Sequence, residues 1–275
     1  MQSELIPAVK AGDLKFAAPI PRPARNIFCV GKNYFEHAKE FASSGYDSSS
    51  RSAADAIPEF PIIFSKVPEC VIADGEPVKY PTGVSDSLDY EAELAVIIGK
   101  GGRGISKAAA MDHVWGYTIV NNVTARDLQI RHKQWLIGKS LDTFCPMGPV
   151  AVTADEVDAG DMGIRCWVND ELRQNSNTRD LIFDIPTLIE TCSRGITLMP
   201  GDVIATGTPP GVGLGMRPPV YLKEVNDYLQ GGMVRLGLIA ILVMAVILWA
   251  AWSPLVEAIR IREYVGAIGD FTAPG

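Results

Sequence analysis

The sequence predicts a mixed α+β fold in which short strands dominate and the helices are few and short. Hydrophobic residues make up 47% of the 275 residues and charged residues 21%, which is ordinary for a chain that buries a large core. The 26 glycines and 19 prolines indicate many turns between short strands. No internal repeat is visible along the chain.

The first part of the chain alternates turn-rich stretches with short apolar segments. Residues 1–25 read as an irregular leader that ends in the Pro-rich segment PIPRPAR. A short helix carries His37 and Glu40, and the serine-rich residues 43–56 are expected to form a mobile loop. Short apolar segments between turns predict strands at 26–30, 61–64, 78–80 and 91–98.

The second part continues in the same manner. A helix is expected to begin at Ser106, a good N-cap residue, and to run through KAAAMDHV. Another spans 183–193, with Pro186 near its start and Gly195 soon after its end. Residues 124–136 form either a loop or a helix. Further strands are predicted at 116–120, 164–168 and 202–205.

Residues 224–275 form a tail of different composition. Its segment 236–252, LGLIAILVMAVILWAAW, has 17 residues without a charge, which is the lower limit for a helix that spans a bilayer. Trp249 and Trp252 suit a membrane interface. A buried core helix is the alternative. We expect a transmembrane helix that anchors the chain or contacts a membrane.

Charge and cysteine content exclude several classes of protein. A net charge of −7 and a pI near 5.1 argue against a nucleic-acid partner, which requires a basic face. The five cysteines form no CxxC motif, so neither a zinc site nor a disulfide framework is expected. Cys145 is interpreted as a buried thiol rather than a nucleophile. With no signal peptide at the start, the compartment expected is the reducing cytoplasm.

Three carboxylates stand at the entrance of the apolar segment DYEAELAVIIG. In a strand, Asp89, Glu91 and Glu93 share one face. Parallel carboxylates at the entrance to a core repel one another and are costly to desolvate. A divalent cation, Mg²⁺ or Mn²⁺, would cancel that repulsion. The alternative is a solvated sheet edge that carries alternating acids.

Three other residues fit a catalytic site. His37 and Glu40 are three residues apart on the predicted helix, so they can form a base with its orienting carboxylate. A surface contact is the alternative for such a pair. Lys139 lies among apolar neighbours that would partly desolvate it and direct its charge at a developing anion.

Seven segments, in this order, carry a resemblance to a known family: FCVGKNYFEHAKEF, PIIFSKVPECVI, DYEAELAVIIGKGGRGI, GYTIVNNVTARDLQ, GKSLDTFCPMGP, NTRDLIFDIPTLIE and PGDVIATGTPPGVG. Together they resemble the fumarylacetoacetate hydrolase (FAH) superfamily. The branch is that of bacterial acylpyruvate hydrolases and hydroxyheptadienedioate isomerases. The resemblance covers about residues 26–223, which defines the catalytic domain, and implies an FAH-type β-roll, a Mg²⁺ or Mn²⁺ cofactor and a homodimer.

The resemblance also implies roles for individual residues. It makes His37 and Glu40 a water-activating dyad on a mobile lid, and Lys139 the group that stabilises the enolate. The substrate pocket would be lined by Arg126, Gln129 and Thr208. The metal ligands would be Glu91, Glu93 and the residue at position 122. Asp89 has no clear ligand role in the pattern.

The activity implied is metal-dependent cleavage of a C–C bond in a small 2-oxo acid of the acylpyruvate type, through an enolate. Alternatives within the family are isomerisation or decarboxylation of hydroxyheptadienedioate and decarboxylation of oxaloacetate, a 2-oxo dicarboxylic acid. Two departures leave a catalytically impaired module as a further alternative. Asn122 stands where the family has an Asp ligand, and the sequence after Lys223 departs from the family's closing strands.

Overall fold

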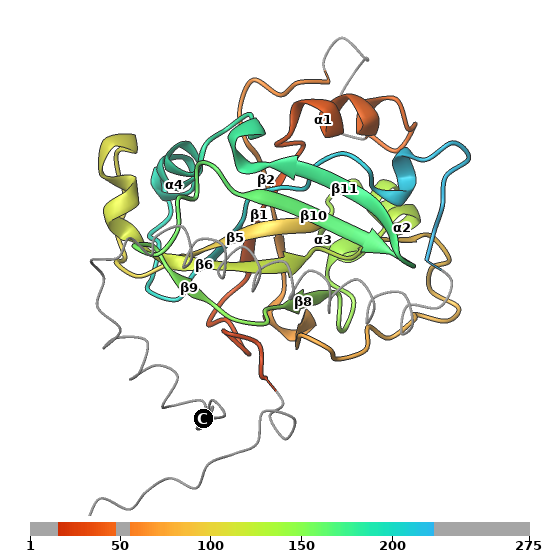
Figure 1. Cartoon of the computed structure of the whole chain (residues 1–275), viewed down its shortest axis with the longest axis horizontal. Helices are drawn as coiled ribbons and strands as arrows, with labels where there is room; N and C mark the ends of the chain where they lie inside the picture. Colours follow the sequence, from red (N-terminus) through yellow and green to blue (C-terminus); the bar gives the residue numbers. More distant parts are fainter. Residues whose placement is uncertain (1–15, 48–55, 223–275) are drawn as a thin grey trace, which may run out of the picture.

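A mixed sheet of eight strands forms the centre of the computed structural model, which describes residues 16–47 and 56–222 (Figure 1). Its strands are β1 (Ile27–Gly31), β2 (Ile62–Lys66), β3 (Val71–Ala73), β5 (Ala92–Ile98), β6 (Val114–Asn121), β8 (Cys145–Met147), β9 (Val152–Thr153) and β12 (Val203–Ala205). They follow the order β2-β1-β12-β5-β6-β8-β3, and β9 pairs with β6. The pairs β1–β12 and β3–β8 are parallel and the others antiparallel.

Two small ladders accompany the main sheet. The hairpin of β10 (Gly163–Val168) and β11 (Glu171–Asn177) crosses in front of β5 and β6 in Figure 1. Its two-residue turn, Asn169–Asp170, has positive φ at both residues, as the twist of a tight hairpin requires. The other ladder pairs β4 (Leu88–Asp89) with β7 (Thr124–Ala125). It places the segment that contains Asp89 beside the segment that leads into Arg126.

The helices are short and lie around the sheet. They are α1 (Phe35–Ala42), α2 (Arg126–His132), α3 (Leu136–Lys139) and α4 (Ile185–Ser193), with 3-10 turns at Pro68–Cys70, Lys107–His113, Thr178–Asp180 and Gly213–Gly215. Asp184 caps α4, because its side chain accepts a hydrogen bond from the backbone N–H of Thr187 at 2.9 Å.

The central strand β5 is buried at every residue, which places it between two layers of core. Ala92 and Ala95 belong to one apolar cluster, whereas Val96 and Ile98 belong to a second, which includes Leu188 of α4. A strand covered on both faces reads as a continuous apolar run rather than as an alternating pattern. The residues immediately before β5 therefore enter a water-poor interior.

Most predicted elements are confirmed, with three corrections. Residues 78–80 form no strand; the backbone N–H of Lys79 bonds instead to the Thr143 hydroxyl at 2.8 Å. The segment after Ser106 is a 3-10 helix, and the Ser106 side chain makes no capping bond. The expected strand 91–98 begins at Ala92, because Tyr90 and Glu91 interrupt the extended segment between β4 and β5.

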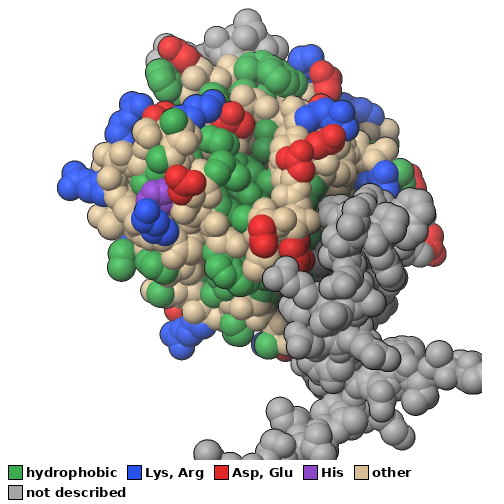
Figure 2. Space-filling view, turned by 60° about the vertical axis from the view of Figure 1, so that its left-hand side comes forward, with side chains coloured by type: hydrophobic (Ala, Val, Ile, Leu, Met, Phe, Trp, Pro, Cys, Tyr) green, Lys and Arg blue, Asp and Glu red, His purple; other side chains and the backbone are tan. Residues whose placement is uncertain are grey.

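The predicted membrane helix at 236–252 lies outside the described residues, as does the whole tail 224–275. Among the residues that are described, no helix is both long and apolar enough to cross a membrane. Figure 2 shows the face on which apolar side chains gather between charged ones. The large apolar side chains exposed in the described ranges include Met111, Trp115, Ile196 and Met199.

Candidate active site

The His37–Glu40 pair is formed as the helical spacing predicts. Both residues lie on α1, and His37 Nδ1 is 3.0 Å from Glu40 Oε2. His37 is buried, which rules out the surface contact considered for the pair. The other carboxylate oxygen, Oε1, accepts a hydrogen bond from the backbone N–H of Gly211 at 3.1 Å. Glu40 therefore ties the histidine to the loop after β12.

The three acids of DYEAELAV are all buried, so the solvated-edge alternative is wrong. Asp89 ends β4, Glu93 lies in β5, and Glu91 lies in the interruption between these strands. Each carboxylate has different partners. Glu91 contacts two cations, Glu93 accepts hydrogen bonds from neutral donors, and Asp89 binds Arg126 and a backbone turn.

The cations on Glu91 come from the two helices that follow β7. Lys139 Nζ, at the end of α3, is 2.6 Å from Glu91 Oε2, and Arg126 Nη1, at the start of α2, is 2.8 Å from Oε1. Lys139 is 1% exposed, in agreement with the desolvated lysine that the sequence predicts. Its ammonium also lies 5.1 Å from the centre of the Phe64 ring.

These contacts give Glu91 and Glu93 different pKa values. Burial alone would raise the pKa of Glu91, but the charges of Lys139 and Arg126 outweigh it and lower that pKa to about 2. Burial, and then the negative charge of Glu91, raise the pKa of Glu93 to about 7. Burial lowers the pKa of Lys139, with the attraction of Glu91 opposing it and the repulsion of Arg126 and Lys66 adding to it. Two adjacent carboxylates thus favour different protonation states near neutral pH.

Asn122 lies beside Glu93. Its Nδ2 donates to Glu93 Oε1 at 2.8 Å, while the backbone N–H of Gly207 donates to Glu93 Oε2 at 2.7 Å. The buried Oδ1 of Asn122 accepts no hydrogen bond within the described ranges. A buried acceptor without a donor is costly, and a cation is one partner that would satisfy it.

The oxygen donors of this site fit a divalent cation, but they carry less negative charge than three carboxylates would. Glu91, Glu93 and Asn122 Oδ1 supply hard oxygen donors of the kind that Mg²⁺ and Mn²⁺ take. Within residues 16–47 and 56–222, no group of three or more His, Cys, Asp or Glu side chains is arranged for a metal ion. Two carboxylates and one amide would therefore have to suffice.

A cleft brings most of the predicted residues together. It is lined by Val30, Gly31, Lys32, His37, Phe41, Phe64, Glu91, Arg126, Gln129, Trp135, Lys139 and Thr208. Its volume is about 10 Å³, which is room for one water molecule. Neither Glu93 nor Asn122 belongs to this lining.

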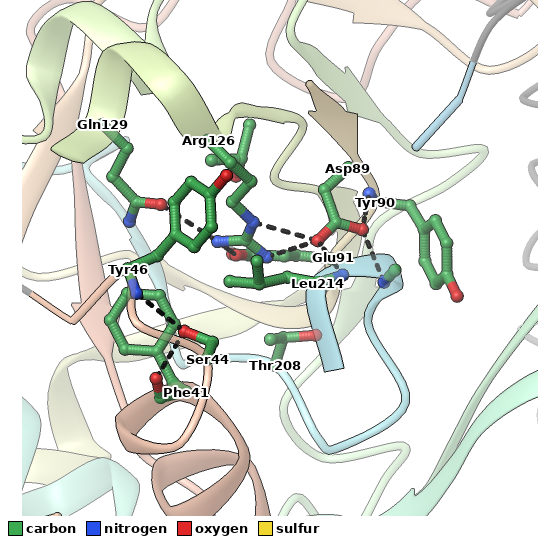
Figure 3. Close-up of polar contacts among 12 residues, drawn as sticks. Phe41, Ser44, Tyr46, Asp89, Tyr90, Glu91, Arg126, Gln129, Thr208 and Leu214 are labelled. Carbon is green, nitrogen blue, oxygen red and sulfur yellow. Dashed lines mark hydrogen bonds and ion pairs between the residues drawn. The ribbon is translucent and has the colours of Figure 1, made fainter. Parts of the chain in front are cut away.

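The three residues expected to bind substrate are already engaged by protein partners, which Figure 3 shows for Arg126 and Gln129. The guanidinium of Arg126 lies between Asp89 and Gln129, and Nη1 donates to Gln129 Oε1 at 3.1 Å. The Thr208 hydroxyl donates to the carbonyl of Ala92 at 3.0 Å and accepts from Gln174 Nε2 at 2.7 Å. The hydroxyl of Thr208 thus helps to hold β5 in place through these two hydrogen bonds.

Sequence reasoning missed two buried residues that support the site. Gln174 of β11 accepts from the backbone N–H of Ala92 at 3.0 Å and donates to Thr208 and to the carbonyl of Pro209. Lys66 of β2 donates to the carbonyls of Val123 and Lys139. A lysine that ends the apolar run PIIFSK was a usable signal, whereas Gln174 stands in the polar run ELRQNSN, which carries no pattern.

The family is shown by the sequence profile described as fumarylacetoacetate (FAA) hydrolase C-terminal, which matches residues 26–239. The chain belongs to the fumarylacetoacetate hydrolase family. Members of this family are enzymes, and the mixed sheet with few helices is consistent with its fold. The match confirms the resemblance read from the seven segments.

Close relatives carry the name of one activity. The oxaloacetate tautomerase YisK of Bacillus subtilis is 54% identical over 213 residues, which cover 77% of this chain and 67% of the relative. The human mitochondrial oxaloacetate tautomerase FAHD2A is 43% identical over 237 residues, covering 85% of this chain and 71% of the relative.

Solved structures of similar proteins are named for other activities. The fumarylacetoacetate hydrolase of Exiguobacterium antarcticum is 46% identical with a TM-score of 0.65, covering 75% of this chain and 70% of that one. Maleylpyruvate hydrolase of Sphingobium sp. SYK-6, solved with manganese and pyruvate, is 35% identical with a TM-score of 0.60. It covers 76% of this chain and 67% of that one.

Proposed function

We propose that this protein is a tautomerase of small 2-oxo dicarboxylic acids, with oxaloacetate as the substrate to test first. The observation that carries the proposal is the buried His37, paired with Glu40, which shares one cleft with Glu91, Arg126 and Lys139. Keto–enol interconversion requires one group that moves a proton between carbon and oxygen and cations that stabilise the enolate. The names of the relatives at 54% and 43% identity support this reaction.

The residues of the chain divide the work as follows. Because Glu40 engages Nδ1 of His37, Nε2 is the nitrogen that faces substrate. Nε2 takes a proton from the carbon between the two carbonyl groups, and the C–H electrons form the C=C bond of the enolate. The Lys139 ammonium donates a hydrogen bond to the enolate oxygen, and His37 Nε2 then gives this oxygen the proton that it took from carbon. Arg126 binds the distal carboxylate with Gln129 beside it.

Glu91, Glu93 and Asn122 would hold Mg²⁺ or Mn²⁺. When bound, the cation supplies Lewis-acid polarisation of a 2-oxo acid. The buried, unpartnered Oδ1 of Asn122 is the observation that supports such a site in this chain. The substitution of Asp by Asn leaves two negative charges for the cation, so weak affinity is part of the proposal.

Hydrolysis of an acylpyruvate is the second candidate, as is decarboxylation of oxaloacetate or hydroxyheptadienedioate through the same enolate. The dyad can activate a water molecule as readily as it moves a substrate proton, and two similar solved proteins are named hydrolases. A catalytically impaired module remains the third candidate because of Asn122.

One set of assays with the purified full chain distinguishes the candidates. Loss of the ultraviolet absorbance of enol-oxaloacetate reports tautomerisation, pyruvate release from acylpyruvates reports hydrolysis, and CO₂ release reports decarboxylation. Each is run with Mg²⁺, with Mn²⁺ and with chelator. Faster enol decay without pyruvate or CO₂ supports the tautomerase, and no acceleration of any reaction supports the impaired module.

Replacing the proposed base tests the mechanism directly. His37→Ala is expected to lower turnover by about 10²- to 10⁴-fold, the usual contribution of general acid–base catalysis. Glu36→Gln, an exposed residue of the same helix that pairs with Lys39, is the matched control and should retain activity. Wild-type turnover in His37→Ala removes the dyad from the mechanism.

A further inference from the structure

Asp89 is the one acid of the DYEAELAV segment that has no role in the proposed reaction. It ends β4, opposite Thr124 of β7, and is fully buried. A buried carboxylate is costly unless its charge and its lone pairs are satisfied. The partners of Asp89 therefore show what its charge is used for.

The two oxygens of Asp89 are saturated by protein donors (Figure 3). Oδ1 accepts from the backbone N–H of Gly213 at 2.7 Å and of Tyr90 at 2.9 Å. Oδ2 accepts from the backbone N–H of Leu214 at 3.0 Å and from Arg126 Nε at 2.9 Å, and Arg126 Nη2 lies in ion-pair contact with it at 2.8 Å. A carboxylate offers about four lone-pair positions, so no position remains for a metal ion or a substrate.

The contact with Arg126 fixes the direction of the guanidinium. Its Nε–Nη2 edge faces Asp89, and this leaves Nη1 toward Glu91 Oε1 and Gln129 Oε1. Because a guanidinium is planar, holding one edge orients the whole group. A weaker hold on that edge would let Arg126 turn away from the cleft.

The contact with the 3-10 turn Gly213–Gly215 reaches the dyad. This turn belongs to the loop after β12, in which the backbone N–H of Gly211 donates to Glu40. The neighbouring Tyr90 hydroxyl donates to the carbonyl of Gly211 at 2.8 Å. The segment Asp89–Tyr90 therefore binds the same loop that holds Glu40, at three points along it.

We propose that Asp89 is a positioning residue, which holds the substrate-binding Arg126 and the loop carrying the Glu40 contact in a fixed relation. This inference rests on the proposed function for the role of Arg126. Asp89 touches neither the substrate nor the reacting atoms. It makes the carboxylate-binding group and the proton-transfer dyad parts of one rigid unit.

A double-mutant cycle tests the coupling, with enol decay of oxaloacetate as the readout. Asp89→Asn is expected to raise KM by about 10- to 100-fold, the effect of losing one charged hydrogen-bonded contact. In an Arg126→Gln background the same change should alter KM less than about twofold. Asp86→Asn changes an exposed acid three residues earlier and is the matched control. It should leave KM unchanged. Equal effects of Asp89→Asn in both backgrounds would mean a general structural role and would overturn the proposal.

A second measurement is made on the wild-type chain and does not depend on turnover. The Nε–H of Arg126 in the wild-type chain should give a shifted NMR signal that exchanges slowly with water, assigned by its absence in Arg126→Lys. An ordinary, rapidly exchanging signal would overturn the positioning role. If the wild type does not accelerate enol decay but the protected signal is present, the substrate class is wrong and the positioning stands.

Discussion

Thr208 joins two segments of the site through a single hydroxyl group. That hydroxyl donates to the carbonyl of Ala92 and accepts from Gln174, whose second amide hydrogen goes to the carbonyl of Pro209. All of these residues are buried. An amide hydrogen that loses its acceptor there cannot bond to water instead.

Removing this hydroxyl should therefore affect stability more than substrate affinity. Thr208→Val leaves Gln174 Nε2 with an unsatisfied hydrogen and is expected to lower the free energy of unfolding by about 1–3 kcal/mol. Thr208→Ser keeps the hydroxyl and should lose less. Urea titration measures both variants, and KM measured beside it shows whether the residue also contacts substrate. A Val variant as stable as the wild type contradicts this account.

Asn122 stands where the resemblance implies an Asp ligand. Its amide oxygen can reach a cation, but it brings no negative charge, and hard cations bind through charge as well as oxygen count. Asn122→Asp is expected to tighten Mn²⁺ binding by about 10- to 100-fold or more, since even a lost supporting contact weakens a site by that much. Calorimetry on both proteins measures it. Equal affinities would show that residue 122 is not a ligand.

At the scale of elements, α1 carries the dyad and is held by contacts of its last turn. Phe41 packs edge-on against Trp135, with ring centres 6.0 Å apart, in a cluster with Val212 and Leu214. Glu40 approaches the backbone of Gly215 so closely that a side chain at 215 would overlap its carboxylate. The absence of a side chain at this position is what lets Glu40 reach both His37 and Gly211.

Gly215→Ala should therefore separate catalysis from folding. The added methyl group meets the flexible end of the Glu40 side chain rather than backbone, so the protein can fold by moving Glu40 aside. We expect a near-normal melting temperature with turnover reduced by about tenfold or more, because His37 loses its orienting partner. Gly195→Ala is the control, since a methyl group there meets nothing within 4 Å. Unchanged turnover in Gly215→Ala would mean that the dyad tolerates displacement of Glu40.

Sequence patterns predicted elements well where one local rule decides them. The spacing of His37 and Glu40 predicts their contact on α1, and the apolar run of β5 predicts a buried strand. The hairpin strand β11 was missed because ELRQNSN has no apolar alternation; it forms through pairing with β10 and through buried Gln174. The role of Asp89 depends on residues more than 120 positions away, and no local pattern encodes such a contact.

At the scale of the whole molecule, two expectations stay predictions: the homodimer, and membrane contact through residues 236–252. The described body itself offers a measurable property, which is the burial of its thiols. All five cysteines of the chain are free and buried. Cys29 lies in β1, Cys166 in β10 and Cys192 in α4, whereas Cys70 and Cys145 are neighbours.

Thiol reactivity should therefore report opening of the structure as a whole. Burial raises the pKa of Cys192 to about 11, so that at pH 8 only about one molecule in a thousand carries the reactive thiolate at this site. Burial does the same for Cys166, to about 12. We expect iodoacetamide at pH 8 to label the native chain slowly and to label all five thiols at once in denaturant. Destabilising variants such as Thr208→Val should speed native labelling exponentially with the lost stability, by about 5- to 150-fold for a loss of about 1–3 kcal/mol, because labelling follows the population of the open state. Mass spectrometry identifies each site. The hydrogen bond with Cys145 lowers the pKa of Cys70, so this thiol is left out of the comparison. Rapid native labelling of Cys166 or Cys192 would show that its part of the fold opens on its own.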